Sequence, residues 1–475
     1  MRHPVSTSLS GSELQSTAAL LWTPQAWVAG GWQADVLLHI DSAGCFAQVQ
    51  PDTPCPLGAT VLPGPVLPGL VNAHSHAFQR AFAGLAERRH SADDDFWGWR
   101  DRMYAVALRV SPAMLRAVAG QLYAELLQGG YTQVCEFHYL QHAPDGRPYA
   151  DALTMCQALM QAAADTGIGL TLLPVLYERA GFSQPALRDD QRRFASSAAS
   201  VLALRQGVLA ARQPLVNAGV AVHSLRAARP ESINDLVRAL ADEPTPIHIH
   251  IAEQTAEVSD CLAATGQRPI AWLAQHVALD ARWQLVHATH AEPAEIDTVA
   301  TSGAGVVLCP STEANLGDGL ADLPRWLASA TPLAIGSDSH VGRQWPAELR
   351  LLELGQRLLL RQRNVAAAPL QGQPATAARL FNRHLDSGAA AAGFPAWGLV
   401  AGARADLLVL DTQADALLGV PATHQLDALV FSSDSPAFAD VWVAGQRRVA
   451  AGRHQQHAVL RAAHTAAMAQ LWAAG

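Results

Sequence analysis

The sequence predicts an α/β protein in which a (β/α)8 TIM-like barrel carries a small β-sandwich domain formed by both chain ends. Three observations support this fold class. Eight short apolar runs alternate with longer Ala-, Leu- and Arg-rich segments of helical period in the middle of the chain. Short strand-like stretches occupy both ends of the chain. Titratable residues directly follow several of the apolar runs, which is where a barrel places its active site.

The two chain ends have the pattern of small β-sheets, because short apolar stretches are interrupted by Gly and Pro. Residues 1–63 and 397–455 are therefore predicted to form one composite β-sandwich domain, followed by a C-terminal helix over 456–475. The predicted strands include residues 34–40, 45–49, 405–410, 428–431 and 441–449. The last of these folds over an Ala-Gly turn at 444–445.

The barrel is predicted over residues 64–396. Its eight strands are expected at 66–72, 132–138, 169–176, 220–224, 247–252, 283–288, 305–309 and 332–336. Apolar runs of this length that alternate with helical segments are typical of parallel strands buried on both faces. Eight such runs over about 330 residues indicate a closed barrel, and its chemistry is expected where the strands end.

The composition indicates a compact chain with a large core, since 50% of the 475 residues are hydrophobic and 16% are charged. Intrinsic disorder is therefore excluded. The 33 basic and 41 acidic residues give a net charge of -8, which repels phosphate backbones and anionic lipid. Neither nucleic acid nor a membrane is expected as a partner. The sequence has no signal-like start and no apolar window of about 18 residues, so we expect a cytoplasmic protein.

Two features of the composition exclude whole classes of chemistry. The chain contains no lysine, so all 33 basic residues are arginines. This excludes Schiff-base enzymes, pyridoxal phosphate enzymes and P-loop NTPases, each of which needs a lysine at the reacting centre. The six cysteines include no Cys-x-x-Cys pair, which argues against a thiolate zinc site or a disulfide framework.

The first predicted barrel strand leads into His74-Ser-His76. Alternate residues on a strand point the same way, so both imidazoles could face one metal ion. The pair alone is weak evidence, because a chain with 19 histidines contains such a pair by chance about once. An ordinary histidine pair in a loop would have the same sequence.

Other titratable residues recur where further predicted strands stop. They are His223, His250, Glu253, His287 and Asp338. In a barrel these strand ends meet at one face, so the residues are expected to form a catalytic mouth. Histidine and aspartate ligands suit Zn²⁺ with a water completing the coordination, and iron or manganese would also bind. Two-metal barrels usually bridge their ions with a carboxylated lysine, and without lysine one metal per chain is expected.

The barrel with these residues at its strand ends resembles the amidohydrolase superfamily, and His250-Ile-Ala-Glu253 is similar to the HxxE signature of its mononuclear deaminases. A closer resemblance, to the formimidoylglutamate deiminases, lies in four further motifs. These are Leu70-Val-Asn-Ala-His74-Ser-His76-Ala-Phe-Gln79-Arg80, Phe96-Trp-Gly-Trp-Arg100-Asp-Arg-Met-Tyr104, Glu136-Phe-His-Tyr139 and His223-Ser-Leu-Arg226. The resemblance spans nearly the whole chain.

This resemblance implies hydrolysis of N-formimino-L-glutamate to N-formyl-L-glutamate and ammonia, a step of histidine degradation. The implied ligands of one Zn²⁺ are His74, His76, His250 and Asp338. Zinc lowers the pKa of a bound water towards ~7, so the water can attack the formimino carbon at neutral pH. Glu253 would move a proton from this water to the leaving nitrogen. His287 would hold the nucleophile, and Asp338 can also accept a proton from it.

The resemblance also implies the contacts to a dicarboxylate substrate. Arg226 and Arg100 would bind carboxylate, as arginine does by bidentate pairing, and Gln79, Tyr139 and His223 would also contact the substrate. Arg100 lies in an aromatic-rich insertion long enough to cover the mouth of the barrel. Without the resemblance, it could equally be a surface arginine stacked on a neighbouring tryptophan, Trp97 or Trp99. A homodimer is the assembly that the family implies.

Two other functions are compatible with parts of this pattern. A deaminase that acts on a nucleobase or nucleoside would keep the metal site but needs amide and aromatic contacts to a flat ring, whereas the two arginines favour an acid. A binding or scaffolding protein could keep the barrel and lose catalysis. The complete set of metal-ligand candidates together with Glu253 argues against that loss.

Overall fold

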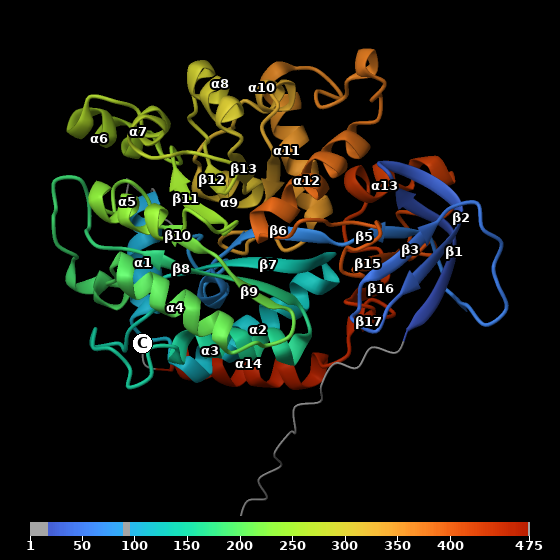
Figure 1. Ribbon diagram of the computed structural model, residues 1–475, viewed down its shortest axis with the longest axis horizontal. Coiled ribbons are helices and arrows are strands. Elements are labelled where there is room, and N and C mark those ends of the chain that lie inside the picture. The colour runs from blue at the N-terminus through green and yellow to red at the C-terminus, as the bar shows by residue number, and fades with distance from the viewer. Residues whose placement is uncertain (1–17, 89–95, 474–475) are drawn as a thin grey trace, which may run out of the picture.

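The computed structural model describes residues 18–88 and 96–473, and in them two nine-stranded sheets (Figure 1). The first sheet is parallel and contains eight strands in chain order. They are β6 (Leu70–Ser75), β7 (Tyr131–His138), β8 (Gly169–Leu176), β10 (Val220–Val222), β11 (Ile247–Ile251), β12 (Trp283–His287), β13 (Gly305–Leu308) and β14 (Leu333–Ile335). Short β9 (Val216–Ala218) pairs with β8. A parallel bridge between Ser75 and Asp338 joins β6 to the segment after β14 and closes the barrel.

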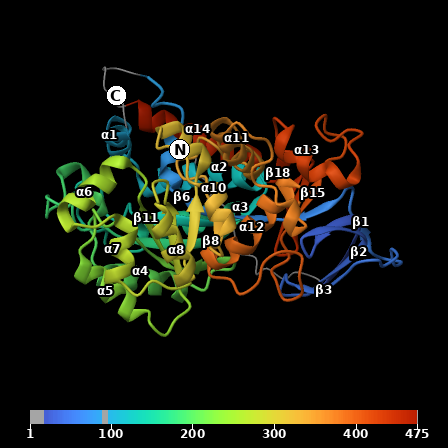
Figure 2. The ribbon, with the colours of Figure 1, turned by 90° about the horizontal axis from the view of Figure 1, so that it is seen from above.

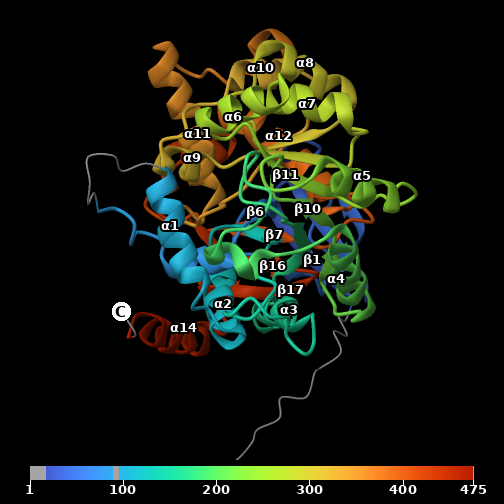
Figure 3. The same ribbon diagram turned by 90° about the vertical axis from the view of Figure 1, so that its left-hand side faces the viewer.

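The predicted α/β barrel is therefore confirmed, and helices surround its strands (Figure 3). They are α2 (Pro112–Gln128), α3 (Thr154–Thr166), α4 (Ala198–Ala210), α5 (Pro230–Ala239), α6 (Thr255–Thr265), α7 (Pro269–His276), α8 (Pro293–Ser302), α9 (Pro310–Leu316), α10 (Leu323–Ala328), α11 (Trp345–Leu360) and α12 (Thr376–Ala392). Local sequence sets several of their ends. Ser111 caps α2 by accepting a hydrogen bond from the Met114 amide, and left-handed glycines such as Gly167 and Gly303 end α3 and α8.

Alternation along the strands separates the barrel interior from its helical coat. Val286, Val307 and Ala334 lie in register with one another and with His250, so their side chains point, like that of His250, into the barrel. There they form a small apolar cluster with Ala73, Cys309 and Ala391 of α12.

The second sheet is mixed and is formed by strands from both chain ends, beside the barrel (Figure 2). Its order is β18 (Arg453–His454), β17 (Gln446–Ala450), β16 (Phe438–Val443), β15 (Leu407–Leu410), β5 (Val66–Pro68), β1 (Ala19–Val28), β2 (Gly31–Ile40) and β3 (Phe46–Gln50), with β4 (Thr60–Val61) paired to β1. The two chain ends meet where β5 pairs antiparallel with β15. The turn at 444–445 connects β16 and β17 through two residues of positive φ, as the sequence predicts.

Two predicted strands differ from the structure. The run 66–72 is split at Gly69, so its first part is β5 in the second sheet and only its second part is β6 in the barrel. Glycine is needed there because a Cβ would lie 2.3 Å from the Thr132 hydroxyl oxygen. Residues 428–431 form part of the helix α13 (Gln425–Phe431), which buries Leu426 and Leu429. A four-residue apolar run does not distinguish a strand from one side of a short helix.

The remaining helices lie around the mouth and along one side of the barrel. α1 (Phe96–Ala107) and η1 (Ala77–Ala81) follow β6, η2 (Asp189–Phe194) follows β8, and η3 (Pro369–Gln371) and η4 (Ala422–His424) are short connections. The predicted C-terminal helix is α14 (His457–Trp472), which packs along α2. The first 17 residues of the predicted β-sandwich, residues 89–95 of the insertion and the last two residues of the chain lie outside the described part. None of the helices described is long and apolar enough to cross a membrane.

Candidate active site

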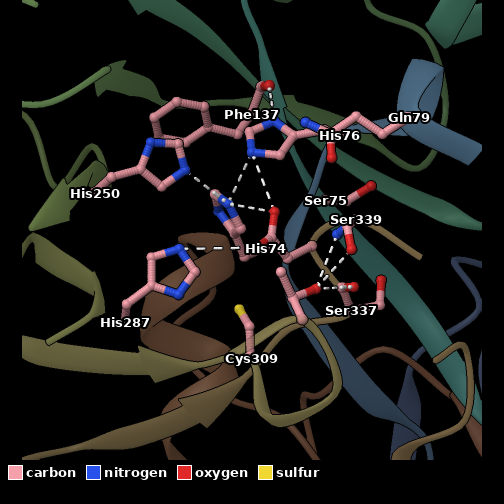
Figure 4. A network of polar contacts seen from close by, with 12 residues as sticks. His74, Ser75, His76, Gln79, Phe137, His250, His287, Cys309, Ser337 and Ser339 are labelled. Carbon is pink, nitrogen blue, oxygen red and sulfur yellow. Dashed lines mark hydrogen bonds and ion pairs between the residues drawn. The ribbon is translucent and has the colours of Figure 1, made fainter. Parts of the chain in front are cut away.

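Four side chains converge at the carboxyl end of the barrel, and they are the four predicted metal ligands. Figure 4 labels three of them, His74, His76 and His250. The Nε2 atom of His74 lies 3.1 Å from Nε2 of His76 and 3.0 Å from Nε2 of His250. The Oδ1 atom of Asp338 lies 3.5 Å from Nε2 of His74 and 3.3 Å from Nε2 of His76. The two strand-one histidines, β11 and the segment after β14 thus supply one cluster of nitrogen and oxygen atoms.

The hydrogen bonds behind the cluster set the tautomers of two of these rings. Nδ1 of His76 lies 2.9 Å from the Phe137 carbonyl oxygen, and Nδ1 of His250 lies 2.9 Å from the His223 carbonyl oxygen. A carbonyl oxygen only accepts, so each Nδ1 carries the hydrogen and each Nε2 presents a lone pair to the cluster.

The lone pairs of these Nε2 atoms point towards one another, and protonation of the rings does not relieve their repulsion. Burial lowers the pKa of His74 to about 3 and also holds the pKa values of His76 and His250 below the ordinary histidine range. Three neutral imidazoles and a carboxylate directed at one point are the donor set of a divalent metal site. The residues therefore fit one ion such as Zn²⁺.

Strained backbone positions aim the loops that follow the strands. His287, Ala252 and Asp338 all have positive φ, at 72°, 52° and 48° respectively. Such conformations are uncommon for residues other than glycine and are held by their surroundings. The buried carboxylate of Glu257 accepts hydrogen bonds from the amides of Ala252 and Glu253, at 3.2 and 3.0 Å. This carboxylate fixes the loop from which Glu253 projects.

Glu253 and His287 form an acid/base pair beside the cluster. Nε2 of His287 lies 3.6 Å from Oε1 of Glu253 and 3.7 Å from Oδ2 of Asp338. Burial raises the pKa of Glu253 to about 7. Burial alone would lower the pKa of His287, but the carboxylates of Glu253, Glu313 and Asp338 outweigh it and raise the value to about 10.

Glu313 is a site residue that the sequence analysis missed. Its Oε1 lies 3.2 Å from Nδ1 of His287 and accepts a 2.8 Å hydrogen bond from the Cys309 amide. The contact holds the His287 ring with Nε2 directed at Glu253. The available signal was a glutamate four residues after the seventh predicted strand, which has no histidine at its end.

A small pocket opens over the cluster. Every predicted site residue lines it except His74, which lies fully buried beneath. The lining residues are His76, Gln79, Trp99, Arg100, Met103, Tyr104, Tyr139, His223, Arg226, His250, Glu253, His287, Leu316 and Asp338. Residues predicted from seven separate segments of the sequence therefore meet in one cavity.

The predicted substrate contacts occupy the wall of this pocket. Gln79 donates to the Tyr139 hydroxyl at 3.0 Å, and its own Oε1 has no hydrogen-bond partner within the described residues. Arg100 reaches the pocket from α1, with its guanidinium 5.5 Å from the ring centroid of Tyr104. This placement replaces the alternative of a surface stack on Trp99, and the Trp97 side chain lies outside the described part of the chain. Arg226 is 8% exposed.

A larger cavity adjoins the pocket on its outer side. Arg100 and Arg226 line both cavities, whereas the histidines line only the inner one. Arg100 and Arg226 therefore lie where the outer cavity and the pocket over the metal-ligand cluster come together.

Comparisons with known proteins agree with this geometry. Residues 66–448 match the model of the amidohydrolase family. The chain is 46% identical over 438 residues to the formimidoylglutamate deiminase of Pseudomonas aeruginosa, covering 91% of this chain and 95% of that protein. It is 28% identical to a 5-methylthioadenosine/S-adenosylhomocysteine deaminase of Haloarcula marismortui, with 89% of each chain covered.

Solved structures show the same fold. An amidohydrolase from Brucella melitensis superimposes with a TM-score of 0.90 at 39% identity and covers 95% of this chain and 99% of its own. A zinc complex of the atrazine chlorohydrolase of Arthrobacter aurescens shares the fold alone, with a TM-score of 0.81 at 21% identity, and covers 95% of this chain and 100% of its own. The resemblance to the formimidoylglutamate deiminases is thereby confirmed, and the chain belongs to the amidohydrolase family.

Proposed function

We propose that the protein hydrolyses N-formimino-L-glutamate to N-formyl-L-glutamate and ammonia, as a zinc-dependent step of histidine degradation. The observation that carries this proposal is the composition of one pocket. A cluster that fits a divalent ion lies beside the acid/base residue Glu253, and the buried Arg226 and partly buried Arg100 line both this pocket and the larger cavity next to it. Such a pocket suits a substrate with a hydrolysable C–N bond near one end and carboxylates near the other. The Pseudomonas aeruginosa relative bears the name of this activity.

The chemistry divides among the residues of the cluster. His74, His76, His250 and Asp338 would hold Zn²⁺, which when bound lowers the pKa of water towards ~7 and polarises the substrate. Glu253 takes a proton from the attacking water and delivers it to the leaving nitrogen, for which a pKa of about 7 is suitable. Asp338 can accept a further proton from this water.

His287 stabilises the oxygen that becomes negatively charged as the water adds to the formimino carbon. Its Nδ1 is engaged by Glu313, so Nε2 faces the reacting atoms. The water oxygen forms a bond to carbon, the bond from carbon to the terminal nitrogen breaks, and the protons of the water pass to that nitrogen. The products are the formyl compound and ammonia.

The rest of the substrate would be held by the pocket wall. Arg100 and Arg226 would pair with the carboxylates, and the Gln79 Oε1 atom offers an acceptor for an N–H group of the amidine. Tyr139 and His223 complete the wall beside them. The resemblance further leads us to propose a cytoplasmic homodimer, which light scattering on the purified protein tests as a mass of twice 50.4 kDa.

An ammonia-release assay tests the proposed reaction. The compounds to compare are N-formimino-L-glutamate, N-formiminoglycine, a guanidino acid and adenosine, with the Glu253→Gln variant as the blank for catalysis by this site. We expect the highest kcat/KM with N-formimino-L-glutamate. Faster turnover of adenosine would replace the proposal by a nucleoside deaminase. Absence of turnover with all four compounds from metal-loaded protein would favour a binding function.

A further inference from the structure

Two buried phenols and one amide form a compact polar group, and one of the phenols, Tyr104, lines the pocket. Gln191 of η2 is fully buried, and its Nε2 lies 3.0 Å from the Tyr104 hydroxyl and 3.0 Å from the Tyr177 hydroxyl. The two hydroxyl oxygens lie 3.4 Å apart. Tyr104 belongs to α1 and Tyr177 follows β8, so three separate segments meet here.

The orientation of the Gln191 amide follows from its third contact. Its Oε1 accepts the backbone N–H of Arg188 at 3.0 Å. An N–H needs an acceptor, so oxygen must occupy this position and the NH2 group must face the two phenols. Gln191 therefore donates one hydrogen to each hydroxyl oxygen.

The hydroxyl hydrogens of Tyr104 and Tyr177 cannot both find an acceptor within this group. Each phenol carries a single O–H, and both oxygens already accept from Gln191. One hydroxyl can donate to the other across 3.4 Å, but the second O–H then has no acceptor among the described residues. Tyr104 lines the pocket whereas Tyr177 does not. Tyr177 is thus the internal donor, and the O–H of Tyr104 turns to the cavity.

We infer that the Tyr104 hydroxyl is a substrate-binding group that donates a hydrogen bond to a carboxylate of the ligand. The inference rests on the proposed function and adds a residue that the family motifs do not assign. The Arg100 guanidinium lies 5.5 Å from the Tyr104 ring centroid, so the hydroxyl belongs to the wall that a carboxylate meets. Two hydrogen bonds received from Tyr177 and Gln191 polarise the O–H and make it a stronger donor.

The first variant removes only the hydroxyl. Tyr104→Phe keeps the ring on which Arg100 and Arg188 rest, at 5.5 and 5.6 Å. A lost hydrogen bond to a charged group predicts a KM for N-formimino-L-glutamate that rises roughly ten- to a hundredfold. The kcat and the metal content should stay within about twofold of the wild type, since Tyr104 makes no contact with the metal-ligand cluster. The matched control is Tyr131→Phe, whose buried hydroxyl lies at the start of β7 and has no partner in the described chain.

The second variant redirects the proton without removing it. Gln191→Glu preserves the shape of the side chain and can still accept the Arg188 amide, but it cannot donate to the phenols. Both hydroxyls then donate to the new carboxylate, and Tyr104 no longer serves the cavity. We expect the same rise in KM as for Tyr104→Phe, and no further rise in the double variant.

Binding of glutarate separates this inference from the proposed reaction. The wild type and Tyr104→Phe are titrated with this dicarboxylate by calorimetry, which requires no turnover. A roughly tenfold or greater loss of glutarate affinity in the variant supports the inference, even if wild-type turnover of N-formimino-L-glutamate is absent and the proposed reaction fails. Unchanged glutarate affinity together with unchanged KM overturns it, whatever the substrate proves to be.

Discussion

At the residue level, the proton transfer that we propose for Glu253 requires a carboxyl group with a pKa near neutral pH. An exposed glutamate is fully ionised there, but burial raises the pKa of Glu253 to about 7. His287 stays beside it because Glu313 engages the opposite ring nitrogen. Burial and a fixed histidine together place the carboxyl between its two protonation states.

The first prediction concerns Glu253→Gln. The variant should retain its metal, because Glu253 is not among the converging ligand atoms, while kcat falls by roughly 10²- to 10⁴-fold as for a lost general acid/base. Glu253 must be ionised to accept the first proton, so wild-type activity should fall as pH decreases through its pKa. A bound divalent ion lowers the pKa of Glu253 from about 7, so the fall in activity on the acid side of the pH profile should lie at or below about pH 7. Metal analysis and a pH profile check both points. Loss of the metal, or turnover at the wild-type rate, would remove Glu253 from the proton path.

The second prediction concerns Arg226→Met. A carboxylate left without its buried partner costs about 2 to 5 kcal/mol, so kcat/KM for N-formimino-L-glutamate should fall by at least about thirtyfold. The metal content should not change. The matched control is Arg229→Met, three residues along the chain, because Arg229 is half-exposed and bound to Glu178 outside the pocket. N-formiminoglycine should be affected less than the dicarboxylate. An equal fall in kcat/KM for both compounds would show that Arg226 does not bind the second carboxylate.

The sequence predicted the site residues that lie at strand ends, because the position of a strand end is encoded locally by where an apolar run stops. Gln191 and Glu313 were not predictable in this way. Each lies in a short helix after a strand, and its role depends on side chains from distant segments, such as Tyr104 for Gln191 and His287 for Glu313. Local patterns do not contain such tertiary contacts.

At the level of elements, the eight barrel strands were predicted well because their burial on both faces produces continuous apolar runs. β8 is buried along its whole length and coincides with its predicted range. The chain ends were harder to assign, because their strands carry mixed polarity. The ten-residue β1 mixes buried, partly buried and exposed residues without a regular period, so the sequence does not delimit it. The sequence predicts a strand at the end of α13, because the apolar positions there are adjacent over only four residues.

The third prediction tests the junction between the two sheets at Gly69. A Cβ on this residue would lie 2.3 Å from Oγ1 and 2.4 Å from Cγ2 of Thr132, so Gly69→Ala should cost about 1 to 3 kcal/mol of stability. Thermal unfolding should show a melting temperature lowered by a few degrees. Gly31→Ala in β2 is the control, since a Cβ there meets nothing within 4 Å. Equal melting temperatures for both variants would mean that the Thr132 side chain can move to accommodate the new Cβ at no cost in stability.

At the level of the whole molecule, the fold brings distant parts of the chain to one point. The metal-ligand candidates come from β6, β11 and the segment after β14, and β6 follows the second sheet directly through Gly69. The bridge between Ser75 and Asp338 closes the barrel at the same place where His74, His76 and Asp338 meet. The barrel therefore closes at the same residues that form the site. A metal ion that binds these side chains should stabilise the entire barrel.

The fourth prediction is that the protein binds one divalent metal per chain and that this metal raises its thermal stability. An ion that binds only the folded state stabilises it by RT ln(1 + [M]/Kd), and removal leaves the Nε2 lone pairs of His76 and His250 close to His74 with no ion between them. Treatment with a chelator should lower the melting temperature, and added Zn²⁺ should restore it. His74→Ala should lose both the metal and this response.

A second ion is not expected at the neighbouring group of His287, Cys309 and Glu313, although these side chains also lie close together. Burial raises the pKa of the Cys309 thiol far above its usual range, so it stays protonated and is a poor ligand. The Glu313 carboxylate is already engaged by His287 and by the Cys309 amide. Cys309→Ala should therefore keep the full metal content that His74→Ala loses. Elemental analysis decides the matter, because two tightly bound ions in the wild type, with one lost in Cys309→Ala, would establish a binuclear site.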